Sequence, residues 1–168
     1  RSPMQSFYLE TGVDDAPCSD VTESGVLIQT PQDVEFVRLL INEVRVDLGS
    51  TVFIQAVADD MMTVYAIEGR TRIETEGAAR FLPEGSRVDI PLNDALAPVS
   101  LPGKPEPYAS DEVILLPTNL LPRNIDIADP ISDTEINAGD VAITLSWDSK
   151  ADLDLRLVEP DGTVVFHD

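Results

Sequence analysis

From residue 33 to residue 92 the chain is a succession of short segments that alternate apolar and polar residues and are separated by turn residues. A period of two is the pattern of a β-strand with one buried face. The predicted strands are 34–41, 44–48, 51–57, 62–67, 70–75, 78–82 and 87–92. Two-residue breaks such as Asn42-Glu43 and Gly49-Ser50 have the length of tight hairpin turns. Regular short strands of this kind predict an all-β domain, either a sandwich, a barrel or a roll.

The alternation of apolar and polar residues predicts which face of each strand is buried. Val52, Ile54 and Ala56 share one face of the segment 51–57, and we expect that face to point into the core. The segment 34–41 differs because it is apolar on both faces, which predicts a strand buried on both sides.

Composition divides the chain into four parts. Residues 1–24 are mixed and partly loop-like, residues 25–92 form the β-domain, residues 93–140 form a connector, and residues 141–168 are the first strands of a second, incomplete β-sandwich. Seven prolines stiffen the connector, because proline fixes φ. We expect the apolar pieces 113–116 and 120–121 to pack along the β-domain, and one helical turn near Ser110–Leu115.

The last 28 residues alternate again. Leu153, Leu155 and Leu157 share one strand face, and Pro160-Asp161-Gly162 supplies a tight turn into the segment 163–167. Three short strands cannot bury their apolar faces alone. We therefore expect either further chain or a neighbouring molecule to complete this sheet.

Charge restricts the partners. The chain has 31 acidic and 11 basic residues, a net charge of −20. Such a chain is repelled by nucleic acid and by an anionic membrane surface, so the expected partner is a protein or a second copy. The single cysteine, Cys18, lies in an acidic stretch that disfavours a reactive thiolate, and its pairing stays open between a free thiol and a partner outside this sequence.

The residues offer little for catalysis, and we expect no enzyme. The only histidine is His167, Ser146 and Ser149 have no nearby base in the sequence, and no phosphate-binding loop is present. One acidic group merits attention as a candidate calcium site, the one cofactor that the sequence suggests. Its members are Asp148, Asp152, Asp154 and Asp161. Calcium takes six to eight oxygen ligands from such groups. The alternative is a solvated strand face in which Asp154 pairs with Arg156.

Two segments resemble known families. Residues 25–31, 44–55, 63–69 and 83–88 resemble a FecR-like domain, a likeness that extends over about residues 25–125 and rests largely on turn glycines. The tail, with Trp147-Asp148, the run 151–155 and Pro160-Asp161-Gly162, resembles the start of a YfaP-type (DUF2135-like) β-sandwich. The first resemblance implies a non-catalytic module that lies outside the cell or in the periplasm, and the second an accessory or adhesion-like sandwich.

The expected function is therefore a non-enzymatic structural or interaction protein, extracellular or at the cell surface, that self-associates through open β-edges. Two alternatives stay open. One is a periplasmic sensory or regulatory module that binds a discrete partner, and the other is an accessory domain of a secreted hydrolase.

Overall fold

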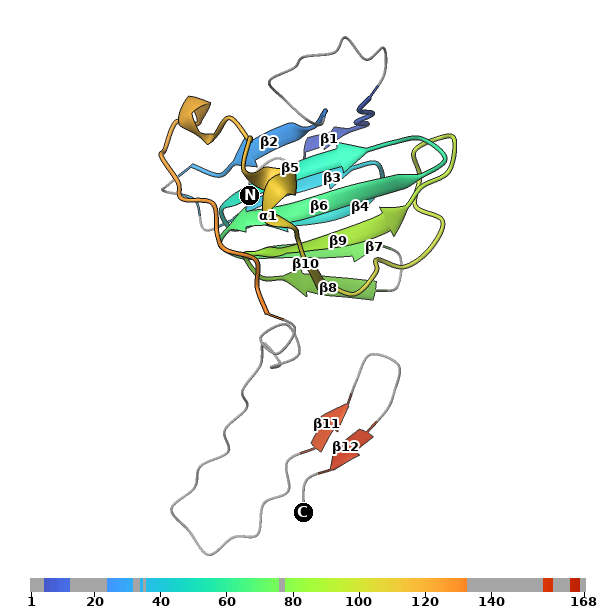
Figure 1. The fold of residues 1–168 in the computed structure, drawn as a ribbon. Coiled ribbons are helices and arrows are strands. Elements are labelled where there is room, and N and C mark those ends of the chain that lie inside the picture. The colour runs from blue at the N-terminus through green and yellow to red at the C-terminus, as the bar shows by residue number, and fades with distance from the viewer. Residues whose placement is uncertain are drawn as a thin grey trace, which may run out of the picture. The chain divides into compact units, whose positions relative to one another are not determined.

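The computed structural model confirms that the chain is all-β and divides it into two compact units, Arg1–Ala138 and Gly139–Asp168 (Figure 1). The described residues are 5–12, 24–31, 34, 36–75, 78–132, 156–158 and 164–166. Within them, no helix has the length and apolar character needed to cross a membrane.

Two five-stranded sheets make up the first unit. The first sheet has the order β1 (Gln5–Phe7), β3 (Val37–Ile41), β4 (Val44–Leu48), β7 (Thr71–Thr75), β8 (Ala78–Leu82). The second sheet has the order β10 (Glu106–Pro107), β9 (Ser86–Pro91), β6 (Met61–Glu68), β5 (Thr51–Ala56), β2 (Val26–Gln29). Every pairing is antiparallel except that of β1 with β3, which is parallel.

The main core lies between the two sheets, to which the alternating residues of both contribute. Val52, Ile54 and Ala56 of β5 are completely buried there, as their spacing predicts, and Val44 and Val46 of β4 face them from the other sheet. Burial alternates residue by residue along β4, β7 and β9, which is the signature of strands with one covered face. The architecture of this unit is therefore a β-sandwich.

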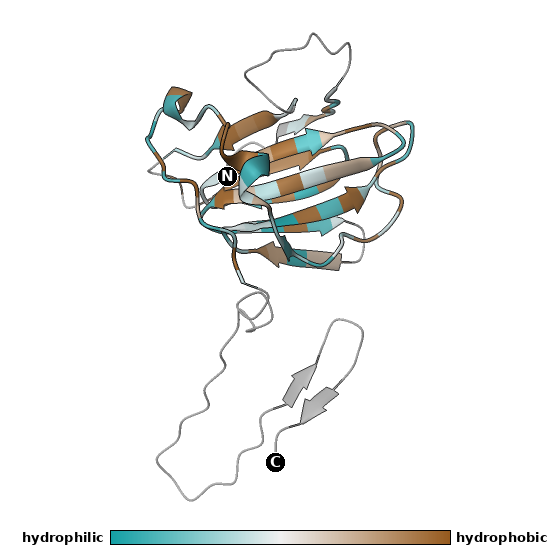
Figure 2. Cartoon of the chain, viewed as in Figure 1, coloured by the Kyte–Doolittle hydropathy of each residue, from teal (hydrophilic) through white to brown (hydrophobic). Residues whose placement is uncertain are grey.

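A second apolar cluster covers the outer face of the second sheet. Phe53 of β5 and Tyr65 and Ile67 of β6 point away from the main core and pack against Tyr108 and Val113 of the connector. Figure 1 shows the short helix α1 (Ser110–Val113) lying over β5 and β6. Figure 2 shows hydrophobic and hydrophilic bands alternating along these strands. The connector thus forms a third layer over the sandwich.

The prediction that residues 34–41 form a strand buried on both faces is wrong. The strand β3 covers only Val37–Ile41, and a single face of it is buried, through Leu39 and Ile41. On the other face Phe36 is exposed and Arg38 and Leu40 are half-buried. The apolar run misled the prediction because no described layer covers the outer face of the first sheet.

The turn between β3 and β4 fastens the N-terminal segment. Asn42 and Glu43 both have positive φ, of 51° and 62°, as a tight primed hairpin turn requires. The buried side chain of Asn42 then accepts a hydrogen bond from Leu9 N and donates one to Leu9 O, each at 2.8 Å. Asn42 therefore serves both as a turn residue and as a clamp on the segment after β1.

In the second unit the structure describes a two-stranded sheet. Its strands, β11 (Arg156–Val158) and β12 (Val164–Phe166), pair antiparallel with Leu157 opposite Val165. The predicted turn at residues 160–162 lies outside the described residues.

Candidate functional site

The acidic group proposed from the sequence as a calcium site lies outside the described residues. This holds for Asp148, Asp152, Asp154 and Asp161, and likewise for Cys18. Calcium binding at these residues stays a prediction. Within the described part of the chain, no three potential ligand side chains come together as a metal-binding group.

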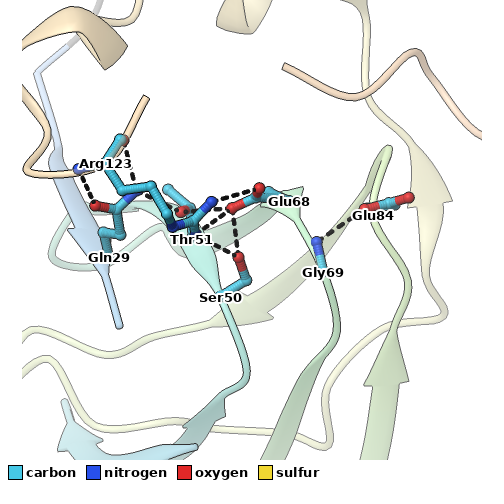
Figure 3. Close-up of polar contacts among 7 residues, drawn as sticks. All are labelled: Gln29, Ser50, Thr51, Glu68, Gly69, Glu84 and Arg123. Carbon is cyan, nitrogen blue, oxygen red and sulfur yellow. Dashed lines mark hydrogen bonds and ion pairs between the residues drawn. The ribbon is translucent and has the colours of Figure 1, made fainter. Parts of the chain in front are cut away.

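The structure brings together a polar cluster that fastens the connector to the sandwich (Figure 3). Arg123 of the connector reaches Glu68 at the end of β6 through two hydrogen bonds, of 2.7 and 2.6 Å. Its guanidinium also donates to Ser50 Oγ at 3.2 Å, and Ser50 in turn donates to Glu68. The side-chain amide of Gln29 on β2 accepts from Arg123 N and donates to Arg123 O, each at 3.0 Å. We call this group of residues, Gln29, Ser50, Thr51, Glu68 and Arg123, the connector clamp.

The electrostatics of the connector clamp suit anchoring more than catalysis. The hydrogen bonds from Arg123 hold the pKa of Glu68 below its ordinary value and are the largest effect on it; burial opposes them, and the hydrogen bonds from Ser50 and Thr51 lower the pKa further. A carboxylate with a lowered pKa is a weak general base, so Ser50, only 8% exposed, gains little nucleophilic character from it. The arrangement binds two segments 55 residues apart to one another.

A second fastening lies at Gly85, in the turn before β9. Gly85 O accepts hydrogen bonds from Ile131 N at 3.0 Å and from Tyr108 N at 3.4 Å. The hydroxyl of Tyr108 donates to Ala128 O at 2.6 Å, and Ala128 N donates to Ile67 O at 3.1 Å. The connector is therefore held to the second sheet along its length as far as Ile131.

The connector clamp gives a testable dependence on pH. Because the folded-state pKa of Glu68 lies below its unfolded value near 4.5, its contribution to stability is present above that pH and is lost as the pH falls through the lowered pKa. Glu68→Gln should remove this acid-sensitive contribution. We expect it to lower the free energy of unfolding at pH 7 by about 1 kcal/mol, the usual contribution of a partly exposed charged pair. Urea unfolding of both proteins at pH 7 and at pH 3.5 measures the difference. A stability gap that persists undiminished at acid pH would contradict this role of the ion pair.

The outer face of the first sheet carries a zigzag of ion pairs, which we call the arginine face. Asp47 on β4 binds Arg38 on β3 through two hydrogen bonds, of 2.6 and 3.0 Å, and lies 3.6 Å from Arg72 on β7. Glu74 pairs with the same Arg72 and, at 3.1 Å, with Arg45 of β4. Two carboxylates thus hold three guanidinium groups in fixed positions across three neighbouring strands.

The guanidinium groups of the arginine face have N–H donors that Asp47 and Glu74 do not use. A guanidinium group has five N–H donors, and the two carboxylates occupy only some of them. The side chains of Arg38 and Arg45 are 40% and 38% exposed, so their remaining donors are open to solvent. Phe36 and Phe81 flank the arginines, with Phe36 under the Arg38 guanidinium at 5.6 Å and Phe81 at the edge strand β8. Fixed cationic groups beside exposed aromatic rings are a binding surface for carboxylates on an apolar backing.

The strand edges of the sandwich are less suited to binding. Of the four edge strands, β1, β10 and β2 have three, two and four residues, which are too short to template a partner strand well. On β8, Arg80 stands opposite the buried Ile73 and turns its guanidinium to Gly103 O and Ala79 O. An inward-pointing charge on an edge strand is a feature that discourages strand addition.

A hollow of about 480 Å³ lies at one end of the sandwich. It is lined by Glu43, Thr75, Pro98, Val99, Ser100 and Leu101. Half of these lining residues are polar or charged and half are apolar. It does not join the connector clamp or the arginine face, with which it shares no residue.

Sequence reasoning did not single out either the connector clamp or the arginine face. The alternation of charge in 44–48 and 70–75 was a usable signal for the face, because it places Arg45, Asp47, Arg72 and Glu74 on one side of two paired strands. No local signal marks Arg123, because its partners are fixed only by the path of the connector.

Comparison with known proteins adds no further constraint: no protein-family model, no curated protein and no solved structure matches the chain.

Proposed function

We propose that this chain is a non-enzymatic structural or interaction protein whose β-domain binds an acidic partner through the arginine face. The observation that carries the proposal is the contrast between the two sides of the sandwich. One side is sealed by the connector, with Tyr108 and Val113 buried against it. The other presents ordered guanidinium groups and exposed aromatic rings.

Charge segregation supports the same function. Arg38, Arg45 and Arg72 lie on the outer side of the first sheet with Asp47 and Glu74, so these five side chains together carry one net positive charge. The rest of the chain then holds 8 basic and 29 acidic residues. The guanidinium groups attract an acidic partner at short range, whereas the acidic remainder of the chain repels it, so such a partner is expected to bind at this face and not elsewhere on the chain.

The proposal places the contact on a sheet face, whereas the sequence favoured open strand edges. The short edge strands β1, β2 and β10 and the inward Arg80 of β8 weigh against edge addition in this unit. An extracellular or cell-surface setting, or a periplasmic one, accords with the FecR-like resemblance of residues 25–125 and remains part of the proposal.

The test is binding of a fluorescent ten-residue oligoglutamate peptide to the full chain at 0.15 M salt. We expect Arg45→Gln/Arg72→Gln to bind at least tenfold more weakly than the unaltered chain, because it removes donors and leaves Asp47 and Glu74 to repel the peptide. The matched variant Arg80→Gln/Lys104→Gln changes net charge equally away from the face and should retain binding. Equal loss in both variants would show general electrostatics and would refute a specific site.

A further inference from the structure

The connector exposes a second surface, on the side of the sandwich opposite the arginine face. Val113 faces the sheet, but its neighbours Ile114 and Leu115 are 68% and 51% exposed, and Leu120 is 78% exposed. Two carboxylates on the connector are exposed as well, Asp111 on the same helix α1 and Asp126 further along the chain. Figure 2 shows hydrophobic and hydrophilic residues side by side along this part of the chain. We call Asp111, Ile114, Leu115, Leu120 and Asp126 the acidic strip.

The two surfaces are complementary in both properties. The arginine face joins cationic groups to the exposed aromatic rings of Phe36 and Phe81, which are 47% and 57% exposed. The acidic strip joins carboxylates to exposed aliphatic side chains. Contact would pair guanidinium with carboxylate groups and remove apolar area from water on both sides, the combination found in specific protein interfaces.

We propose that the occupant of the arginine face is the acidic strip of a second copy of this chain. This inference rests on the proposed function and names its partner. The two surfaces lie on opposite sides of one sandwich, because the first sheet carries one and the layer over the second sheet carries the other. Such a contact is heterologous, so each added copy leaves a free surface at each end. Repeated association therefore builds a linear stack or a ring.

Light scattering of the full chain at 0.15 M salt tests the proposal. At this salt concentration the Debye length is about 8 Å, so the salt screens the long-range repulsion between two acidic molecules. The mass should rise with concentration above the 18.3 kDa of one copy. Arg45→Gln/Arg72→Gln, which disables the face, and Asp111→Asn/Asp126→Asn, which disables the strip, should each stay near the mass of one copy.

Mixing the two variants gives the sharpest result. One retains an intact strip and the other an intact face, so an equimolar mixture should form pairs of two copies and grow no further. If either charge variant fails to fold, Leu120→Ser tests the acidic strip and Phe81→Ser tests the arginine face. These side chains are 78% and 57% exposed, and each substitution should likewise keep the chain near the mass of one copy. A mixture that stays at the mass of one copy would overturn the head-to-tail contact.

The outcomes separate this inference from the function on which it rests. A chain that keeps the mass of one copy at all concentrations, yet binds oligoglutamate at the arginine face, overturns self-association and leaves the interaction function standing. Failure of both measurements overturns both. Growth that neither surface variant reduces would place the contact elsewhere and overturn the inference.

Discussion

Replacing Tyr108 by alanine is expected to lower the free energy of unfolding of the β-domain by about 3–5 kcal/mol, the range for a buried aromatic side chain. Tyr108 is 2% exposed, and its ring centre lies 6.3 Å from that of Tyr65. The substitution removes this packing and the hydrogen bond to Ala128 O, and it leaves a cavity beneath the connector. Urea unfolding followed by far-ultraviolet circular dichroism measures the loss.

The matched control is Tyr8→Ala, which removes the same side chain from a position that is 61% exposed. Its effect should stay within about 0.5 kcal/mol. Hydrogen exchange gives a local readout, because the Ala128 amide, which donates to Ile67 O, should exchange faster in Tyr108→Ala. Equal unfolding midpoints for the two variants would show that burial of the Tyr108 side chain beneath the connector adds nothing to stability.

Ionisation of Tyr108 should lower the stability of the folded chain at high pH. Burial, with smaller effects from Glu84 and Asp129, raises the pKa of Tyr108 to about 12 from the ordinary value of 10.0. Because the folded-state pKa is the higher one, the contribution is present below pH 10 and is lost as the pH rises through about 12. Tyr108→Phe should lack this loss, which unfolding experiments between pH 9 and pH 12 detect.

Gly85→Ala is expected to cost about 2–3 kcal/mol, through left-handed backbone strain and a displaced connector. Gly85 has φ of +83°, and an added Cβ would lie 2.3 Å from Asp129 O and 2.7 Å from Ile131 N. Both are backbone atoms, so the segment 129–131 must move as a whole. The hydrogen bond from Ile131 N to Gly85 O is then lost, and the Ile131 amide should lose its protection against exchange.

Gly12→Ala isolates the conformational part of this cost. Gly12 has a similar φ of +79°, but an added Cβ meets nothing within 4 Å. We expect it to cost about 1 kcal/mol, from the backbone alone. If both variants lost the same free energy, the close approach of the connector to Gly85 would carry no energetic weight.

The sequence by itself determined most of the strands between residues 33 and 92 and their buried side, but not for the segment 34–41, which was predicted to be buried on both faces. The segments 44–48 and 78–82 form strands with the predicted bounds, and Asn42-Glu43 forms the predicted turn. These features depend on side-chain alternation and on residues that tolerate positive φ, and both are local properties. The alternation of charged residues likewise predicts that the arginines and carboxylates of the arginine face share one side of their strands. Which arginine pairs with which carboxylate across β3, β4 and β7 depends on the register of these strands.

Only the tertiary structure decided which sheet faces are covered. Phe53 and Phe81 are both aromatic residues on the outward side of a strand, yet Phe53 is 4% exposed and Phe81 is 57% exposed. The difference arises because the connector crosses β5 and β6, where Arg123, Tyr108 and Ile131 bind groups far away in sequence. Such contacts depend on the path of the whole chain. No local pattern encodes them, and among the described residues they cover the outer face of the second sheet and leave that of the first sheet uncovered.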